Sequence, residues 1–370
     1  MTQLVKTPAL TVNFVEESRR IEAQGPLSLM VQPLLNKINE RLAEEKPAFA
    51  GEDELIPSTW LPPIPSGPFK RLILNEAKIG IGRYVPQTVS IEVTRKCGCS
   101  CDHCTIVNGE GEMCREDIQR VVDEALDLGA CIITFTEGDP MLREDIFELI
   151  SHVDRERAVV NLFTPGLEMT PEKARALKEA GLYNLLIGVY SADPQIHDRI
   201  RGVAGAHEKA LAAIRAGLEA GLMVTMTTHV TPDRVDSLDE LYALACDLGV
   251  MEFSVWEAKP SKEEDRLTQI DREKIMRFYR KVNSSPDGPR AFASTYFEGQ
   301  MMGCMAGQRW LHVGVEGTVR GCPYLEKGYG NVLCQSLKDI WKAIRQSGDF
   351  EGFQTSCPAQ ELFGGSDPMR

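Results

Sequence analysis

The sequence lacks the features of several protein classes. None of its apolar runs approaches the roughly 18–20 residues that cross a bilayer, and its first residues lack the charged-then-apolar order of a secretory signal. It has no excess of positive charge: its formal net charge is −13, which disfavours binding to nucleic-acid phosphates. It also has no G-x-G-x-x-G loop of the dinucleotide-binding type. We therefore expect a cytoplasmic protein without a membrane span or a nucleic-acid partner.

Cysteine, in contrast, is abundant, with 11 residues in a chain of 370. An odd number of cysteines in a long chain without a secretory signal disfavours a disulfide framework and favours metal ligation or catalysis. Four of them lie within residues 97–104. Four more lie near the C-terminus: Cys304, Cys322, Cys334 and Cys357.

The first 85 residues show no pattern of catalytic residues. Pro33 precedes an apolar stripe with helical spacing, formed by Leu34, Leu35, Ile38 and Leu42. A stiff, proline-rich connector follows over residues 61–68. We predict an N-terminal helical extension over residues 1–85 that packs on the outside of the main domain. A substrate lid or a partner-binding arm is the alternative.

From residue 88 onward, short β-branched runs alternate with helical patterns, and a glycine ends most of the helices. The predicted strands are residues 89–93, 132–136, 159–163, 185–189, 224–230 and 252–256. This alternation indicates an α/β fold with a parallel sheet and right-handed crossovers. A full eight-unit barrel needs about 250 residues, so six units within residues 86–290 predict a partial (β/α)6 barrel. In such folds the active site lies at the carboxyl ends of the strands.

The first predicted strand is followed by the motif Cys-x3-Cys-x2-Cys, formed by Cys97, Cys101 and Cys104. Three thiolates can ligate three irons of a [4Fe–4S] cluster, and a missing fourth ligand leaves one iron open for chemistry. The spacing of a bacterial ferredoxin is absent. The alternative is a half-zinc site of Cys101 and Cys104 with Cys97 or His103.

This motif, placed just after a strand, resembles the hallmark of the radical S-adenosylmethionine (SAM) superfamily, and the resemblance extends over residues 88–260. It implies that Cys97, Cys101 and Cys104 bind the catalytic cluster and that SAM binds the open iron. It further implies reductive cleavage of SAM to a 5′-deoxyadenosyl radical, which abstracts a hydrogen atom from the substrate. A reductase, ferredoxin or flavodoxin would supply the electron. Cys99 is an additional thiol within the motif.

The loop after the second predicted strand supports the resemblance. Glu137, Gly138, Asp139 and Pro140 resemble the family's Gly-Gly-Glu-Pro loop, whose backbone and acidic group receive the SAM ammonium. Glu137 replaces the first glycine and Asp139 replaces the acid, so a carboxylate can still face the cation. An ordinary Gly-Asp-Pro turn is the alternative.

Four more residues are candidates for binding the cofactor. Thr164 ends the third strand, where the family often has Thr-Asn-Gly. Ser191 lies in a stretch that resembles the family's ribose-binding strand, and Arg201 could meet the SAM carboxylate. His229 ends the fifth predicted strand and would face the cavity. A surface arginine and a satisfied core histidine are the alternatives for the last two.

The C-terminal segment, residues 291–370, is similar to the SPASM extension of radical SAM proteins in its order Cys304, Gly-x4-Cys322, Gly-Asn and Ile-Trp. A full SPASM domain has further paired cysteines where Cys357 stands alone. We therefore predict a truncated, twitch-like iron–sulfur domain with one auxiliary [4Fe–4S] cluster bound by Cys304, Cys322 and Cys357, with Cys334 as a candidate fourth ligand. Buried free cysteines are the alternative.

The resemblance leaves the substrate open as a peptide or a small organic molecule in the mouth of the barrel. Residues 1–85 do not resemble the winged-helix leader-binding domain that peptide maturases often carry. Two other classes remain as alternatives: an electron-transfer iron–sulfur protein without SAM chemistry, and a zinc-stabilised binding module.

Overall fold

A computed structural model describes residues 1–101, 104, 111–260, 265–352 and 357. Its centre is a ten-stranded sheet with the order β12-β11-β10-β9-β8-β7-β6-β13-β14-β15. The barrel strands are β6 (Thr88–Glu92), β7 (Ile132–Thr136), β8 (Val159–Thr164), β9 (Asn184–Gly188), β10 (Met223–Val230), β11 (Glu252–Glu257) and β12 (Arg290–Ala293). Neighbours among these strands pair in parallel. The predicted α/β partial barrel is confirmed, with β12 as an additional strand.

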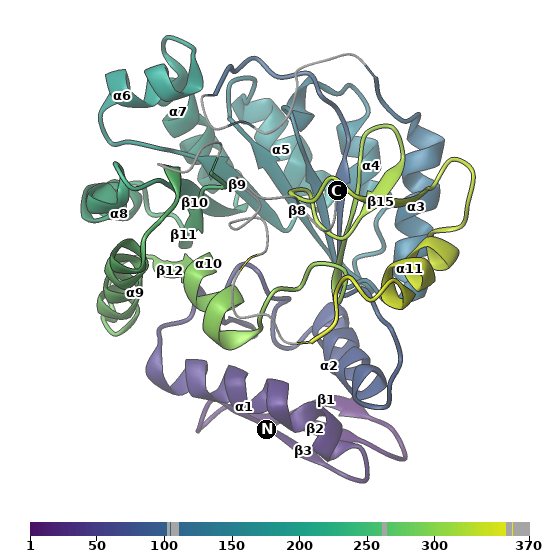
Figure 1. Cartoon of the computed structure of the whole chain (residues 1–370). Coiled ribbons are helices and arrows are strands. Elements are labelled where there is room, and N and C mark those ends of the chain that lie inside the picture. Colours follow the sequence, from purple (N-terminus) through teal and green to yellow (C-terminus); the bar gives the residue numbers. More distant parts are fainter. Residues whose placement is uncertain (102–103, 105–110, 261–264, 353–356, 358–370) are drawn as a thin grey trace.

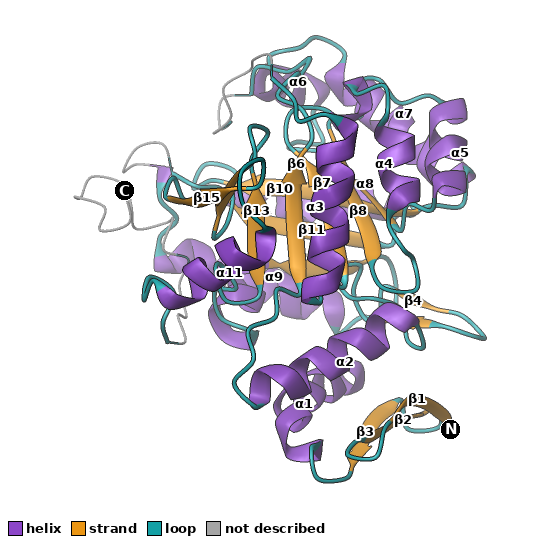
Figure 2. Cartoon of the chain, turned by 90° about the vertical axis from the view of Figure 1, so that its right-hand side faces the viewer, coloured by secondary structure: helices purple, strands orange, loops and turns teal. Residues whose placement is uncertain are grey.

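Helices cover the outer face of this sheet (Figures 1 and 2). They are α3 (Arg115–Leu128), α4 (Ile146–His152), α5 (Pro171–Ala180), α6 (Pro194–Arg201), α7 (Ala206–Glu219), α8 (Leu238–Leu248) and α9 (Gln269–Asn283). The local sequence sets their ends. Thr170 caps α5 by accepting a hydrogen bond from the Lys173 N–H, and Gly181 ends the helix in the left-handed conformation at φ +94°.

The N-terminal segment lies below the barrel in Figure 1 and is more than a helical extension. It contains an antiparallel sheet of β1 (Thr2–Lys6), β2 (Thr11–Val15) and β3 (Arg20–Gln24), then α1 (Ser28–Glu44), β4 (Phe49–Ala50), β5 (Leu55–Ile56) and α2 (Gly67–Gly80). The predicted helix is present, although it begins at Ser28 rather than at Pro33. The three strands were not predicted.

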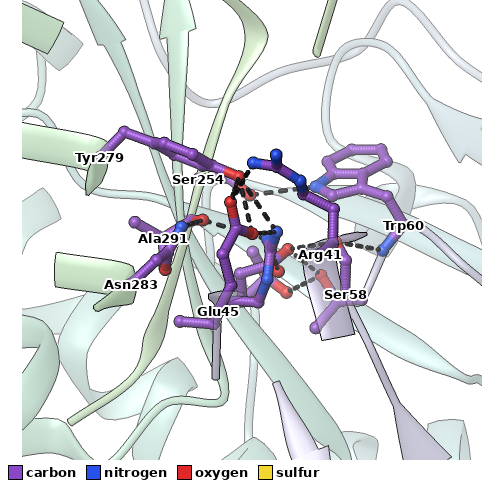
Figure 3. Close-up of polar contacts among 12 residues, drawn as sticks. Arg41, Glu45, Ser58, Trp60, Ser254, Tyr279, Asn283 and Ala291 are labelled. Carbon is purple, nitrogen blue, oxygen red and sulfur yellow. Dashed lines mark hydrogen bonds and ion pairs between the residues drawn. The ribbon is translucent and has the colours of Figure 1, made fainter. Parts of the chain in front are cut away.

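A buried polar network attaches this segment to the amino ends of the last barrel strands, and Figure 3 shows it. The Arg290 guanidinium lies between two carboxylates, 2.8 Å from Glu45 and 2.9 Å from Glu252. The Tyr279 hydroxyl also donates to Glu45, at 2.7 Å, and the Thr59 hydroxyl donates to Glu252, at 2.7 Å. Burial alone would lower the pKa of Arg290, but Glu252, Tyr279 and Glu45 outweigh it and hold the pKa above its ordinary value. We call these residues the base network.

The C-terminal segment continues the same sheet past β6. The strand β13 (Trp310–Val313) pairs in parallel with β6, and β14 (Thr318–Arg320) and β15 (Gly328–Asn331) follow in antiparallel order. Between β12 and β13 lie α10 (Ser294–Tyr296) and a short π-helix over Phe297–Met301. The helix α11 (Leu337–Gln346) contacts α3. Among the described residues, no helix is both long and apolar enough to cross a membrane.

Candidate active site

A cavity of about 610 Å³ runs through the inside of the barrel. Alternate residues of the strands face it, as expected for the inner face of a barrel; on β7 these are Ile132, Thr134 and Thr136. The N-terminal segment contributes Leu34, Ile38, Trp60, Leu61 and Leu72 to its wall. The cysteine loop also lines it. The loop and the N-terminal segment therefore border one continuous space.

The structure brings the predicted cluster ligands together on the loop after β6. Cys97, Cys101 and Cys104 all line the cavity, and so does Cys99. A hydrogen bond from the Cys99 thiol lowers the pKa of Cys97 to about 7, although burial acts in the opposite direction. Three thiols on one tight loop suit an iron–sulfur cluster. His103, the candidate for the zinc alternative, lies outside the described residues.

The loop after β7 packs directly against the cysteine loop. Gly138 has φ +50°, and a Cβ atom there would lie 2.4 Å from the Lys96 carbonyl oxygen. Only glycine allows this close approach. The Asp139 N–H donates to the same carbonyl at 2.8 Å. Glu137 and Gly138 line the cavity, with the half-buried Glu137 in the left-handed region at φ +68°.

Asp139 itself lies behind the cavity wall. Its side chain is fully buried, and its Oδ1 atom accepts hydrogen bonds from the Thr164 hydroxyl at 2.7 Å and from the Met141 N–H at 3.1 Å. Burial raises its pKa. Asp139 caps the short helix Pro140–Leu142. Its partner Thr164 lines the cavity, whereas Asp139 is not among the lining residues. The contacts of Asp139 thus fix a turn, while the backbone of Gly138 faces the site.

Arg201 lies beside the cysteine loop. Its guanidinium donates to the Gly188 carbonyl at 2.7 Å and to the Cys101 sulfur at 3.7 Å, and it lies 4.5 Å above the Tyr190 ring. Burial would lower its pKa, but Tyr190 and the cysteines raise it above its ordinary value. A permanent positive charge therefore lies against the thiols.

The two remaining cofactor candidates differ in position. His229 lines the cavity, with its ring 5.9 Å from that of Tyr190. Ser191 is buried but is not among the residues that line the cavity. Its hydroxyl accepts a hydrogen bond from the Asp193 N–H at 3.1 Å, in the turn before α6. Ser191 therefore shapes this turn.

The C-terminal cysteines form a second group. Cys304, Cys322 and Cys357 are close enough to influence one another's titration, and burial together with Cys357 raises the pKa of Cys304 to about 12. The Lys259 ammonium donates to the Cys357 sulfur at 3.1 Å. Cys334 is exposed in the loop between β15 and α11. The structure therefore gathers three of the four predicted auxiliary ligands and places the fourth at the surface.

Sequence reasoning missed several residues of the cavity. Lys259 lies two residues beyond the end of β11, and the rule that active-site residues follow barrel strands could have found it. Trp60 comes from the N-terminal segment and gave no local signal. Its ring contacts those of Trp256 at 5.1 Å, Phe292 at 5.5 Å and Phe163 at 6.0 Å, so these residues form one aromatic wall.

Comparison with known proteins agrees with this arrangement. Residues 91–245 match the model of the radical SAM superfamily. An AdoMet-dependent heme synthase from Methanosarcina barkeri is 25% identical over 305 residues, which cover 74% of this chain and 87% of that protein. A PqqA peptide cyclase from Streptomyces rochei is 27% identical over 288 residues, covering 72% and 78%.

Solved structures show the same fold. Streptococcus suis SuiB, at 13% identity, aligns with a TM-score of 0.62 over 90% of this chain and 84% of that one. The enzyme anSMEcpe with bound AdoMet, at 16% identity, aligns with a TM-score of 0.55 over 70% and 78%. With the cysteine motif gathered on the loop after β6, the sequence matches show that residues 91–245 form a radical SAM domain, and the solved structures show the fold of the chain around it.

Proposed function

We propose that the chain cleaves SAM reductively to a 5′-deoxyadenosyl radical and abstracts a hydrogen atom from a substrate held inside the barrel. The observation that carries this proposal is that Cys97, Cys101 and Cys104 line the same cavity as the loop around Gly138. The three thiols would hold a [4Fe–4S] cluster, which supplies the electron for cleavage when a reductase, ferredoxin or flavodoxin has reduced it.

The residues around the thiols have separable tasks in this proposal. Arg201 offsets the negative charge that thiolate ligands bring, and it remains our candidate for the SAM carboxylate. The backbone beside Gly138 is open to the cavity and is our candidate for the SAM ammonium, with Asp139, Pro140 and Thr164 holding its shape.

We further propose that residues 291–370 form an auxiliary-cluster domain in which Cys304, Cys322 and Cys357 hold a second [4Fe–4S] cluster. The mutual proximity of the three thiols supports this proposal. Lys259 supplies a neighbouring positive charge at 3.1 Å from Cys357. The exposed Cys334 has no part in the proposed ligand set.

For the substrate, we propose a flat, largely apolar molecule of tetrapyrrole size that carries carboxylate groups. Three relatives are named AdoMet-dependent heme synthases, at 25–27% identity. The aromatic wall around Trp60 offers ring faces for stacking, and Lys259 is a cation in the cavity that a carboxylate can meet. The peptide cyclase relative makes a peptide the second candidate.

The test uses anaerobically purified, reconstituted protein. We expect about eight irons per chain, four for each of two clusters, and release of 5′-deoxyadenosine from SAM on reduction. Cys101→Ala should abolish that release, whereas Cys114→Ala should preserve it, because Cys114 is exposed at the start of α3. Equal release by wild type and Cys101→Ala would refute the ligand assignment. Heme serves as the substrate-class probe, and failure to bind it would favour a peptide.

A further inference from the structure

A second group of buried polar residues lies where β6, β13 and the end of β7 meet. The carboxyl groups of Glu92 and Glu137 and the imidazole of His312 each place one atom within 4.8 Å of the others. Glu92 and His312 are buried, whereas the half-buried Glu137 lines the cavity. We call these three residues the wall triad.

The hydrogen bonds of the wall triad fix the protonation of His312. The Trp310 indole N–H donates to the Ser90 hydroxyl at 2.8 Å, so that hydroxyl is free to donate to His312 Nδ1 at 2.9 Å. The remaining ring nitrogen, Nε2, then carries the proton and donates to Glu92 Oε1 at 2.9 Å. Burial lowers the pKa of His312 and favours this neutral form. Ser90 and Trp310 also line the cavity.

The two carboxyl groups therefore differ in charge. Glu92 accepts from His312 and from the Val315 N–H at 2.9 Å, and Arg320 lies 4.0 Å away. Burial would raise its pKa, but these partners lower it, so Glu92 is ionised. Burial and the charge of Glu92 raise the pKa of Glu137 to about 8, although Arg320 acts in the opposite direction. Tyr324 lines the same cavity, and burial, with a smaller contribution from the charge of Glu137, raises its pKa.

A bound metal ion explains this arrangement less well than a proton does. The Nε2 atom of His312 already donates its proton to Glu92 and has no lone pair to offer. The Arg320 guanidinium, 4.0 Å from Glu92, would also repel a divalent cation. A neutral Glu137 beside an ionised Glu92 is instead the pattern of an acid poised to exchange a proton.

We propose that Glu137 exchanges a proton when a cationic ligand enters the cavity, and that Glu92 and His312 are the positioning residues that hold it ready to do so. The ligand brings one positive charge into the cavity. The Glu137 carboxyl group releases one proton to solvent, and the carboxylate that remains offsets the charge of the ligand. The O–H bond of Glu137 breaks, and no electron moves. This inference rests on the proposed function, because it takes SAM, with its sulfonium and ammonium groups, as the ligand.

The experiment measures protons released on SAM binding, by calorimetry in buffers of different ionisation enthalpy, with reconstituted wild-type protein and Glu137→Gln. Any proton that SAM itself releases on binding is released with both proteins. The difference in proton release between wild type and Glu137→Gln therefore measures the contribution of Glu137. At pH 7 we expect wild type to release close to one proton more per bound SAM than the variant, and the excess should vanish by about pH 10. Equal release at pH 7 would overturn the proposal.

Two variants make the result specific. Glu316→Gln removes an exposed carboxylate that is paired with Arg95 at the same end of the barrel, and it should release as many protons as wild type. His312→Gln should keep the release but move its pH midpoint, because the hydrogen bond to Glu92 changes. An unchanged midpoint would refute the positioning role. Failure of every variant, including wild type, to bind SAM would contradict the proposed function instead.

Discussion

The base network and the wall triad each bring two carboxyl groups together in the same barrel, but they compensate the charge differently. At the amino ends of the strands, Arg290 lies between Glu45 and Glu252, at 2.8 and 2.9 Å. At the carboxyl ends, the neutral His312 donates a hydrogen bond to Glu92, and Glu137 lines the cavity. The comparison teaches that one end uses buried charge to join two segments, whereas the other leaves an acid uncompensated, as functional sites do.

Removal of Arg290 should break the base network with the largest effect. Arg290→Met leaves the fully buried Glu252 without its counterion, whereas Glu45 keeps the Arg41 guanidinium at 2.6 Å. We expect the free energy of unfolding to fall by about 3–5 kcal/mol. Anaerobic guanidinium denaturation measures this loss. The matched control is Arg272→Met, whose ion pair with Glu257 is partly exposed and should cost about 1 kcal/mol or less. Equal losses in the two variants would show that the buried base network stabilises the fold no more than a partly exposed ion pair does.

At the wall triad, substitution of the acid should instead increase the free energy of unfolding at high pH. The pKa of Glu137 is about 8 in the folded chain, above its ordinary value of 4.5, so the folded state holds a proton that the unfolded chain releases between these two values. Wild type therefore loses stability as pH rises from 4.5 to 8. Glu137→Gln removes this cost and should be more stable than wild type at pH 9 by roughly 1–3 kcal/mol, and equal to it near pH 4.5. A stability difference that does not change with pH would contradict the protonation of Glu137.

The smallest effect is expected from a pair that is close to the wall triad but exposed. The Arg95 guanidinium lies 2.7 Å from Glu316, and both side chains reach solvent. Glu316→Ala should lower the free energy of unfolding by about 0.2–1 kcal/mol, and 1 M salt should erase the difference. Denaturation at low and high salt measures it. A larger, salt-independent loss would mean that this pair belongs to the buried site.

Six of the seven barrel strands could be predicted because they are short, mostly apolar runs that alternate with helical patterns along the chain. The predicted strand over residues 159–163, for example, differs from β8 by one residue. The strand Thr11–Val15 was missed although Val12 and Phe14 are buried in strict alternation, because it lies outside the strand–helix alternation from which the barrel strands were predicted.

The cysteine motif could be singled out from the sequence because its three cysteines lie within eight positions of one another, and all three line the cavity. The wall triad gave no such signal, since His312 is 220 positions away from Glu92. Only the pairing of β13 with β6 brings them together. Lys259 likewise became visible only once the cavity was known. A motif of residues that are close in the sequence could therefore be predicted, whereas contacts that depend on long-range strand pairing could not.

The pairing of β6 with β13 also has a consequence for how the protein is made. During synthesis β6 emerges first of the barrel strands, and one side of it has no neighbour until residues 310–313 leave the ribosome. For most of translation this edge presents unpaired N–H and C=O groups directly beside the cysteine loop, which is the situation that favours association with another chain. A ribosome stall or truncation before Trp310 would therefore leave an aggregation-prone nascent chain, even with every residue of the cysteine motif already made.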